Sequence, residues 1–237
     1  RTMFRGIAKV PPGCIVAWSR GETAAARYWD VSFPPRDGYE RRSEHEWAEG
    51  LREKLAESVR LHMVSDVPVG AWLSGGIDSS SVAALMSTMA ADPVKTFTMR
   101  ARESAYDELR DAHALDEYPA FRLDGHHVLC GPEDFELLPK AIWHTEGQVL
   151  GSIATGQLRI AQASAEHVKV VLCGEGSDEM LGGYSWYPTL PVLDAVFALP
   201  AGVRRWIAGI PAVRRRWPGA AGTIAGPREM GFERYSA

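Results

Sequence analysis

The sequence has few cysteines, and no two of them lie close together. Cys14, Cys130 and Cys173 are widely spaced and odd in number, so they form neither a disulfide framework nor a Cys-x-x-Cys metal site. Such usage is typical of a reducing compartment, and we predict a cytoplasmic protein. Internal repeats and low-complexity tracts are also missing, and 46% of the residues are hydrophobic. This composition excludes a disordered or collagen-like chain.

A large excess of charge of either sign is missing as well. Lys and Arg number 26 and Asp and Glu number 30, so the formal net charge is −4. Without a basic excess nucleic acid is not favoured as a partner, and we predict that none is bound. The apolar stretch over residues 190–203 is interrupted by Pro191, Asp194 and Pro200 and is too short to cross a bilayer. We therefore predict no membrane partner.

The 237 residues suffice for one large domain, or for one domain and part of another. The chain begins at Arg1 rather than Met, and residues 231–237 resemble neither a capped helix end nor a polar tail. We therefore expect a piece of a longer protein. Residues 4–31 contain β-forming residues and a Pro-Pro-Gly turn, which indicates short strands. The proline-containing residues 32–39 have the composition of a linker.

After this linker, short apolar runs alternate with helical patterns. Ser43 and Glu46 have the spacing of a capping box. The apolar residues that follow recur every four positions: Trp47, Leu51, Leu55 and Val59. Strands are expected at 69–73, 94–99, 127–130 and 168–173, and helices at 79–90, 135–143 and 153–165. Pro139 is expected to break or kink the second of these helices. The alternation predicts an α/β fold with a parallel sheet covered on both faces, followed by basic helices beyond residue 188.

The strongest motif reads Leu73-Ser74-Gly75-Gly76-Ile77-Asp78-Ser79-Ser80 and stands between a buried strand and a helix. The first N–H groups of a helix and its dipole favour an anion there, and two glycines let the backbone approach a phosphate. The Asp78 carboxylate would repel phosphate unless a cation lies between them, which indicates magnesium. The motif is not a Walker A loop, because the chain contains no Gly-Lys dipeptide. A serine-capped turn without a ligand is the alternative.

A second motif, residues 174–179, reads Gly-Glu-Gly-Ser-Asp-Glu and is followed by Gly182-Gly183-Tyr184. It also follows a predicted buried strand, and ligands collect at the carboxyl ends of the strands in a doubly wound sheet. We therefore predict that both motifs lie on one rim, where Asp78 and Asp178 share one magnesium ion. A solvated acidic loop is the alternative.

Together, residues 74–79 and 174–184 resemble a known family. The first segment resembles the pyrophosphate loop of the N-type ATP pyrophosphatases, and both resemble the synthetase domain of glutamine-hydrolysing asparagine synthetases. Further matches are Tyr106-Asp107-Glu108, His126-His127, Trp143-His144 and Glu233-Arg234-Tyr235. Residues 2–29 resemble the last strands of the family's β-rich glutaminase domain. The resemblance implies an adenine-nucleotide α-hydrolase-like sheet over residues 35–237, incomplete at its carboxyl end, and a glutaminase remnant over residues 1–34.

The resemblance also implies a reaction: aspartate is activated by ATP as β-aspartyl-AMP, pyrophosphate leaves, and ammonia from glutamine gives asparagine. Glu175 then corresponds to the general base for the ammonia step, and Asp78 and Asp178 correspond to the magnesium ligands. The residues that correspond to the ATP and pyrophosphate site are Leu73, Ser74, Gly75, Gly76, Ser79, Ser80, Met99 and Gly174. The glutaminase domain of the full-length protein would be a partner, and a homodimer stays open.

Some residues separate the alternatives. Relatives that close β-lactam rings carry Tyr where this chain has Glu175, so glutamate favours an intermolecular ammonia acceptor. Another adenylating amide former, such as a peptide cyclase or an amidotransferase of secondary metabolism, remains an alternative. So does a nucleotide-binding relative without activity, although the intact Asp78, Glu175 and Asp178 argue against it. Glu146 is either a further site residue or a surface acid at a helix end. His126 and His127 lack metal partners at ligand spacing and are interpreted as strand residues.

Overall fold

The computed structural model describes residues 2, 4–32, 35, 38–101, 118–146, 153–184, 187, 190–216 and 224. It divides into two compact units, Arg1–Gly174 and Glu175–Ala237. Tyr106-Asp107-Glu108 and Glu233-Arg234-Tyr235, which carry part of the family resemblance, lie outside the described residues. The expected domain boundary between residues 34 and 35 stays a prediction.

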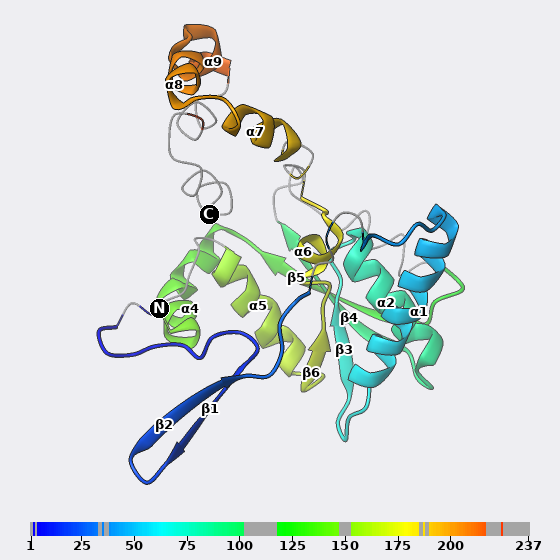
Figure 1. Cartoon of the computed structure of the whole chain (residues 1–237). Coiled ribbons are helices and arrows are strands. Elements are labelled where there is room, and N and C mark those ends of the chain that lie inside the picture. The colour runs from blue at the N-terminus through cyan, green and yellow to red at the C-terminus, as the bar shows by residue number, and fades with distance from the viewer. Residues whose placement is uncertain are drawn as a thin grey trace. The chain divides into compact units, whose positions relative to one another are not determined.

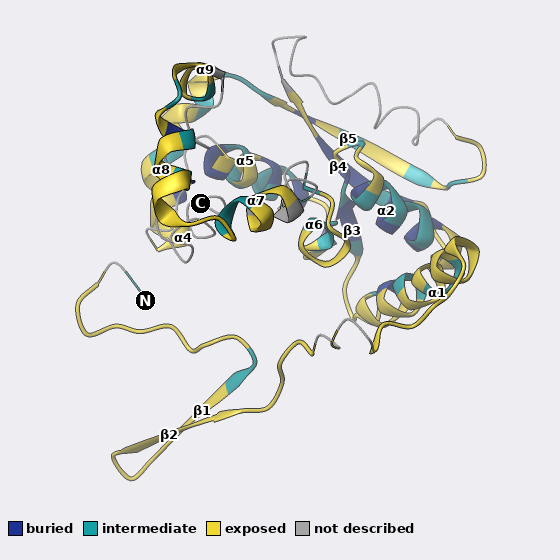
Figure 2. Ribbon diagram, turned by 45° about the horizontal axis from the view of Figure 1, so that its top comes forward, coloured by how far each residue is buried: buried dark blue, intermediate teal, exposed yellow. Residues whose placement is uncertain are grey.

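A hairpin opens the chain, as the β-forming residues predict. Strands β1 (Cys14–Ser19) and β2 (Glu22–Arg27) pair antiparallel, with Cys14 opposite Arg27 and Ser19 opposite Glu22. Arg20 and Gly21 form the turn with φ of 52° and 84°, which are the left-handed values that a two-residue hairpin turn needs. Nearly all of the hairpin is exposed in this chain (Figure 2).

The main sheet of the first unit is parallel, as predicted. Its strands are β3 (Val69–Trp72), β4 (Val94–Ala101), β5 (Leu123–Cys130) and β6 (Val170–Leu172). Their order is β5-β4-β3-β6, and every neighbouring pair runs parallel (Figure 1). The chain therefore moves from β3 outward to β5 and then returns to the other side of β3. This reversal makes the space beyond the carboxyl ends of β3 and β6 a switch point of a doubly wound sheet.

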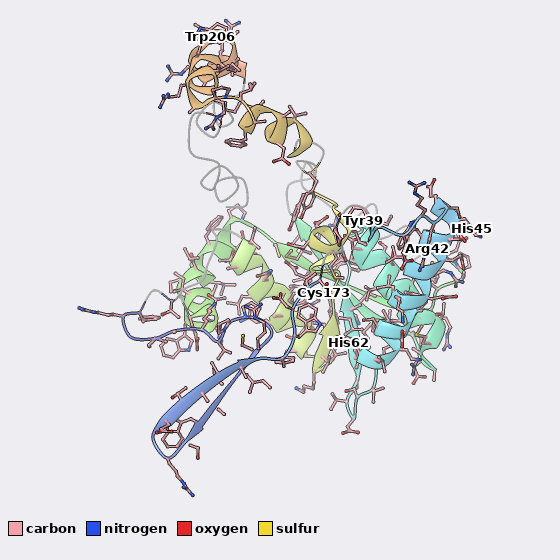
Figure 3. All side chains as sticks on the ribbon, viewed as in Figure 1. Tyr39, Arg42, His45, His62, Cys173 and Trp206 are labelled. Atoms are coloured by element: carbon pink, nitrogen blue, oxygen red, sulfur yellow. The ribbon has the colours of Figure 1, made fainter. Side chains whose placement is uncertain are left out.

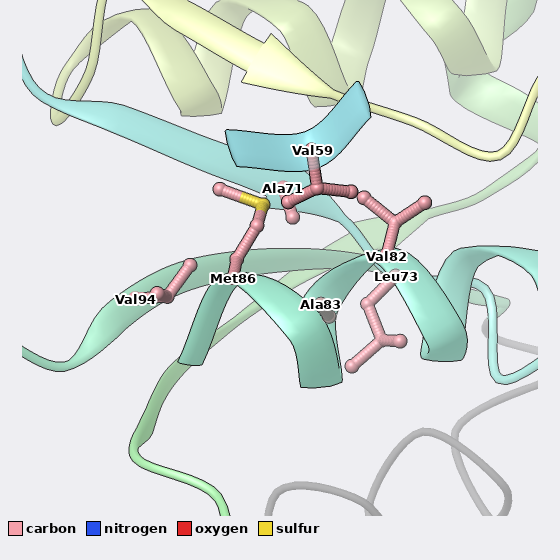
Figure 4. Packing of buried hydrophobic residues seen from close by; sticks show 7 residues of the cluster. All are labelled: Val59, Ala71, Leu73, Val82, Ala83, Met86 and Val94. Carbon is pink, nitrogen blue, oxygen red and sulfur yellow. The ribbon is translucent and has the colours of Figure 1, made fainter. Parts of the chain in front are cut away.

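Helices cover both faces of this sheet (Figure 1). On one face, α1 (Glu44–His62) and α2 (Ile77–Met89) pack on β3 and β4 through a cluster of buried residues. Figure 4 shows its members: Val59, Ala71, Leu73, Val82, Ala83, Met86 and Val94. On the other face, α5 (Ile153–Ala165) packs on the sheet through Phe97, Val128, Ile160 and Val168. The predicted α/β sheet with two covered faces is confirmed.

Two local expectations need correction. The helix expected over residues 135–143 is not a single one, because the chain forms a 3-10 helix over Pro132–Leu137 and then α4 over Leu138–Thr145, with the interruption just before Pro139. Pro139 thus lies in the first turn of α4, where its missing N–H has no helical partner to lose. The apolar face of α1 is buried only toward its end: Val59 is 4% exposed, whereas Trp47 is 50% exposed.

His126 and His127 both lie in β5, as expected of strand residues. The ring of His126 stacks on Phe97 at 5.2 Å and lies 4.2 Å from the ring of His167. At the amino-terminal side of this stack, Lys95 Nζ bonds Asp124 Oδ2 at 2.7 Å. This hydrogen bond holds the pKa of Asp124 below its ordinary value.

The second unit is helical, as the pattern beyond residue 188 predicts. It contains α6 (Ser177–Leu181), α7 (Leu190–Phe197), α8 (Ala201–Gly209) and α9 (Pro211–Arg216). In α8 the guanidinium of Arg204 packs on the Phe197 ring at 5.1 Å and donates to Ile224 O at 3.1 Å. In the part of the chain that the structure describes, no helix has the length and apolar character needed to cross a membrane.

The predicted capping box starts α1. Glu46 N donates to Ser43 Oγ at 3.2 Å, and Ser43 N donates to Glu46 Oε2 at 2.7 Å. The hydrogen bonds from Ser43 also lower the pKa of Glu46. Both bonds occupy backbone donors that a helix start otherwise leaves without a partner.

We expect Ser43→Ala to lower the free energy of unfolding by about 1 kcal/mol, because the cap on α1 is lost. Urea denaturation measures this change. Ser58→Ala is the matched control, since Ser58 is an exposed serine inside the same helix and alanine favours helix. If both substitutions lowered the free energy of unfolding equally, the capping hydrogen bonds of Ser43 would not contribute to stability.

Candidate functional site

The loop after β3 is anchored in the sheet and then turns sharply. Leu73 is 1% exposed, and its N–H donates to Phe97 O of β4 at 2.9 Å. Gly75 has φ of +83°, a left-handed value that favours glycine. Gly76 then forms the N-cap of α2. The predicted arrangement of a buried strand, a glycine turn and a helix is therefore present.

Two serine hydroxyls hold this loop in shape. Ser79 Oγ accepts from Ser74 N at 3.1 Å and donates to Gly76 O at 3.2 Å. Because Ser79 has one hydroxyl proton, the 2.9 Å contact between the two hydroxyls has Ser74 as its donor. Ser74 Oγ in turn accepts from Gly76 N at 3.3 Å. Ser79 is 7% exposed, so in this conformation its hydroxyl shapes the loop, whereas Ser74 is exposed.

The start of α2 is open to an anion. Gly76 has no side chain that could cap the helix, and no side-chain cap bond is present among the described residues. The N–H groups of Ile77, Asp78 and Ser79 occupy the first three helical positions, which have no partner inside a helix. Together with the helix dipole, they form the kind of site that binds phosphate.

The loop after β6 approaches this helix start closely. β6 pairs with β3 from Val69 opposite Val170 to Ala71 opposite Leu172, so both loops begin at the same edge. Figure 3 labels Cys173, which is exposed just beyond the end of β6. A Cβ on Gly174 would lie 2.8 Å from Ser79 N and 2.9 Å from Asp78 Cβ. The structure therefore brings Gly174 against the first turn of α2.

Gly174→Ala is expected to lower the free energy of unfolding by about 1–3 kcal/mol, because backbone atoms of α2 must move to admit the methyl group. Chemical denaturation with a circular-dichroism signal measures the change. Gly50→Ala inside α1 is the control, since its Cβ would meet only Arg42 Nη1 at 3.9 Å. That substitution should leave stability unchanged or raise it. A fully stable Gly174→Ala protein would contradict the close approach.

Two carboxylates in the segment after Gly174 have close neighbours within that segment. Asp178 is half-buried. A Cβ on Gly183 would lie 2.0 Å from Asp178 Oδ1, so any larger residue at position 183 would force this carboxylate to move. The Tyr184 hydroxyl donates to Glu179 Oε1 at 2.5 Å. This bond lowers the pKa of Glu179 and raises the pKa of Tyr184 to about 12. Glu179 is thus held as a carboxylate by Tyr184, whereas Glu175 is exposed.

The predicted magnesium site combines a residue of each unit, so the structure of one unit alone does not test it. Asp78 is half-buried in the first unit, and Asp178 belongs to the second, so their joint magnesium site stays a prediction. Within the described ranges, no group of three or more His, Cys, Asp or Glu side chains could hold a metal ion. A magnesium ion there would depend on phosphate oxygens for further ligands.

Met99 and Glu146 lie on other elements. Met99 is 37% exposed near the carboxyl end of β4, and its Sδ would lie 3.1 Å from a Cβ added to Gly156 of α5. Glu146 is the C-cap of α4 with φ of 55°, and its N–H donates to Ile142 O, which places it at a helix end. Gly147 and Gln148, its neighbours, lie outside the described residues. The glycine inside the helix predicted over residues 153–165 was a signal of close packing, but local patterns did not identify Met99 as its neighbour.

Comparisons with known proteins identify related sequences. A family model described as asparagine synthase matches residues 50–234. The chain is 34% identical over 201 residues to amidase chyE of Penicillium rubens, which covers 78% of this chain and 30% of that protein. It is 29% identical over 214 residues to asparagine synthetase (glutamine-hydrolyzing) 1 of Bacillus subtilis, which covers 90% and 33%.

A putative asparagine synthetase of Mycobacterium tuberculosis is 32% identical over 207 residues, covering 86% of this chain and 31% of that protein. The chain thus spans about a third of the length of these curated relatives. Among solved structures, an NH3-dependent NAD synthetase from Campylobacter jejuni aligns with a TM-score of 0.39 and 20% identity, covering 58% of this chain and 60% of that one.

Proposed function

The chain belongs to the asparagine synthase family, and we propose that it carries the ATP site of an enzyme that adenylates a carboxylate and converts it to an amide. The observation that carries this proposal is the contact of Gly174 with the first turn of α2. It joins the two motif loops at the switch point of a doubly wound sheet, where such sheets bind ligands.

We propose aspartate as the carboxylate substrate and ammonia as the acceptor. An oxygen of the aspartate side-chain carboxylate attacks the α-phosphorus of ATP, and the bond to the β-phosphate oxygen breaks to release pyrophosphate. Ammonia then attacks the acyl carbon of β-aspartyl-AMP, loses a proton, and expels AMP. Relatives named glutamine-hydrolyzing align with up to 90% of the chain, which supports glutamine as the source of the ammonia in the full-length protein.

The first loop is suited to the pyrophosphate. The uncapped N–H groups of α2 point along the helix axis toward the loop, and Gly75 and Gly76 leave the backbone accessible. Ser74 is exposed and Ser80 half-buried, so both can offer hydroxyl donors. Ser79 supports the same site from beneath, because its hydroxyl already bonds Ser74 and Gly76. Leu73 and Met99 would line the adenylate.

A magnesium ion would neutralise charge on the leaving pyrophosphate. Asp78 fits this role, because a carboxylate in the first turn beside phosphate-binding N–H groups is repulsive without a cation. Asp178 is the second proposed ligand, and Gly183 leaves its carboxylate in place because it has no side chain.

Asp78→Asn should therefore remove most aspartate-dependent exchange of labelled pyrophosphate into ATP, with a loss of about tenfold or more if about 1.4 kcal/mol of metal-mediated stabilisation disappears. The exchange is measured in the full-length protein. Asp92→Asn, at an exposed aspartate after α2, is the control and should exchange normally. Unchanged exchange in Asp78→Asn would make Asp78 a plain loop residue.

Glu175 is the proposed general base. It follows Gly174 directly and is exposed to an incoming ammonia molecule. The attacking nitrogen must lose a proton after it bonds the acyl carbon, and a carboxylate within reach can accept it. This role comes after adenylation, so the two steps should respond differently to a substitution.

We expect Glu175→Gln to keep pyrophosphate release while asparagine formation falls by about two to four orders of magnitude, as is typical when a general base is lost. Pyrophosphate and asparagine are measured in one reaction of the full-length protein. Glu166→Gln, after α5, is the exposed control. Equal loss of both products would assign Glu175 to the adenylate site, and no loss would remove it from the mechanism.

An enzyme that converts a different carboxylate to an amide is the second candidate. Amidase chyE, at 34% identity, supports it because that relative carries no asparagine synthetase name. The adenylation half-reaction would be the same, and only the carboxylate substrate would differ. Pyrophosphate exchange with a panel of carboxylates in place of aspartate separates the two candidates. An inactive nucleotide-binding protein would bind ATP and show no exchange with any of them.

A further inference from the structure

Helix α5 contains a glycine at a position where a helix-forming residue would be expected. Gly156 is the fourth residue of α5 and half-buried. Glycine weakens the interior of a helix more than any other residue except proline. Such a residue in a helix that covers a sheet indicates that a side chain would collide with something.

The register of α5 on the sheet identifies what Gly156 faces. Ser164 of α5 accepts a hydrogen bond from Trp72 Nε1 at 3.0 Å, and Ile160 packs in the same buried cluster as Phe97. Gly156 is one helical turn before Ile160, and Met99 is two residues beyond Phe97 on the same strand face. One turn of helix and two residues of strand advance by similar lengths, about 6 Å, so Gly156 lies over Met99.

The contact itself is tight. A Cβ on Gly156 would lie 3.1 Å from Met99 Sδ and 3.8 Å from Met99 Cε. Any residue larger than glycine would therefore push the thioether of Met99 away from α5. Methionine has three flexible torsions, so its side chain can move without unfolding the sheet. Met99 is 37% exposed, which leaves its free side available to a ligand.

We propose that Gly156 is a positioning residue that sets the Met99 side chain against the nucleoside part of ATP. This inference rests on the proposed function, because it takes Met99 as part of the adenylate site. Gly156 touches Met99 and acts through it, whereas the phosphate end of the nucleotide is held by the loop after β3. A substitution at Gly156 should therefore affect the nucleoside end alone.

The test compares two probes, ATP and inorganic pyrophosphate, each with magnesium and the full-length protein. Gly156→Ala should raise the dissociation constant for ATP about tenfold, equivalent to about 1.4 kcal/mol, and leave that for pyrophosphate unchanged. Gly50→Ala, the same change inside α1 without a tight contact, should alter neither constant. Thermal unfolding checks that each variant is folded.

A double-mutant cycle with Met99→Ala tests whether Met99 carries the effect. With the thioether removed, Gly156→Ala should have no further effect on the dissociation constant for ATP. Additive losses would overturn the proposal, as would equal weakening of ATP and pyrophosphate, or no weakening of either. If the unsubstituted protein binds neither ATP nor pyrophosphate, the proposed function itself is wrong. That result differs from those that would overturn only the proposal for Gly156.

Discussion

The close approach of Gly174 to the first turn of α2 is the constraint on which the proposed site depends. A Cβ at residue 174 would lie 2.8 Å from Ser79 N, so the backbone after β6 meets the helix start that follows β3. This contact requires β6 to pair directly with β3. The reversal of strand order therefore brings the starts of two loops that are a hundred residues apart in sequence to the same edge, where the site is proposed.

Three glycines on the elements discussed above each permit a close approach by a different neighbour. Gly174 lies against the first turn of α2, Gly183 against the Asp178 carboxylate, and Gly156 against the Met99 thioether. In every case an added methyl group would meet an atom at 3.1 Å or less. A glycine lets neighbouring groups approach its backbone closely, but a larger residue at the same position would push them apart. The Ser74 and Ser79 hydroxyls complete the scaffold by bonding the first loop to itself.

Local sequence patterns predicted much of this fold. Apolar runs identified the parallel strands, and Ser43 with Glu46 identified the start of α1, because both signals act over a few residues. Pro139 indicated an interruption in the helix expected over residues 135–143, and α4 does begin one residue before it, because a proline is unfavourable in a helix interior but suits a first turn. The neighbour of Gly156 could not be read from local patterns, because Met99 lies on a strand distant in sequence.

The measurement that tests the account most directly follows an oxygen atom. Aspartate with heavy oxygen in its side-chain carboxylate is incubated with ATP, magnesium, ammonia and the full-length protein, and the nucleotide products are analysed by mass spectrometry. Attack of the carboxylate on the α-phosphorus transfers one labelled oxygen to AMP when ammonia displaces it. The account predicts labelled AMP together with unlabelled pyrophosphate. Label in inorganic phosphate, or AMP without label, would contradict adenylation at this site.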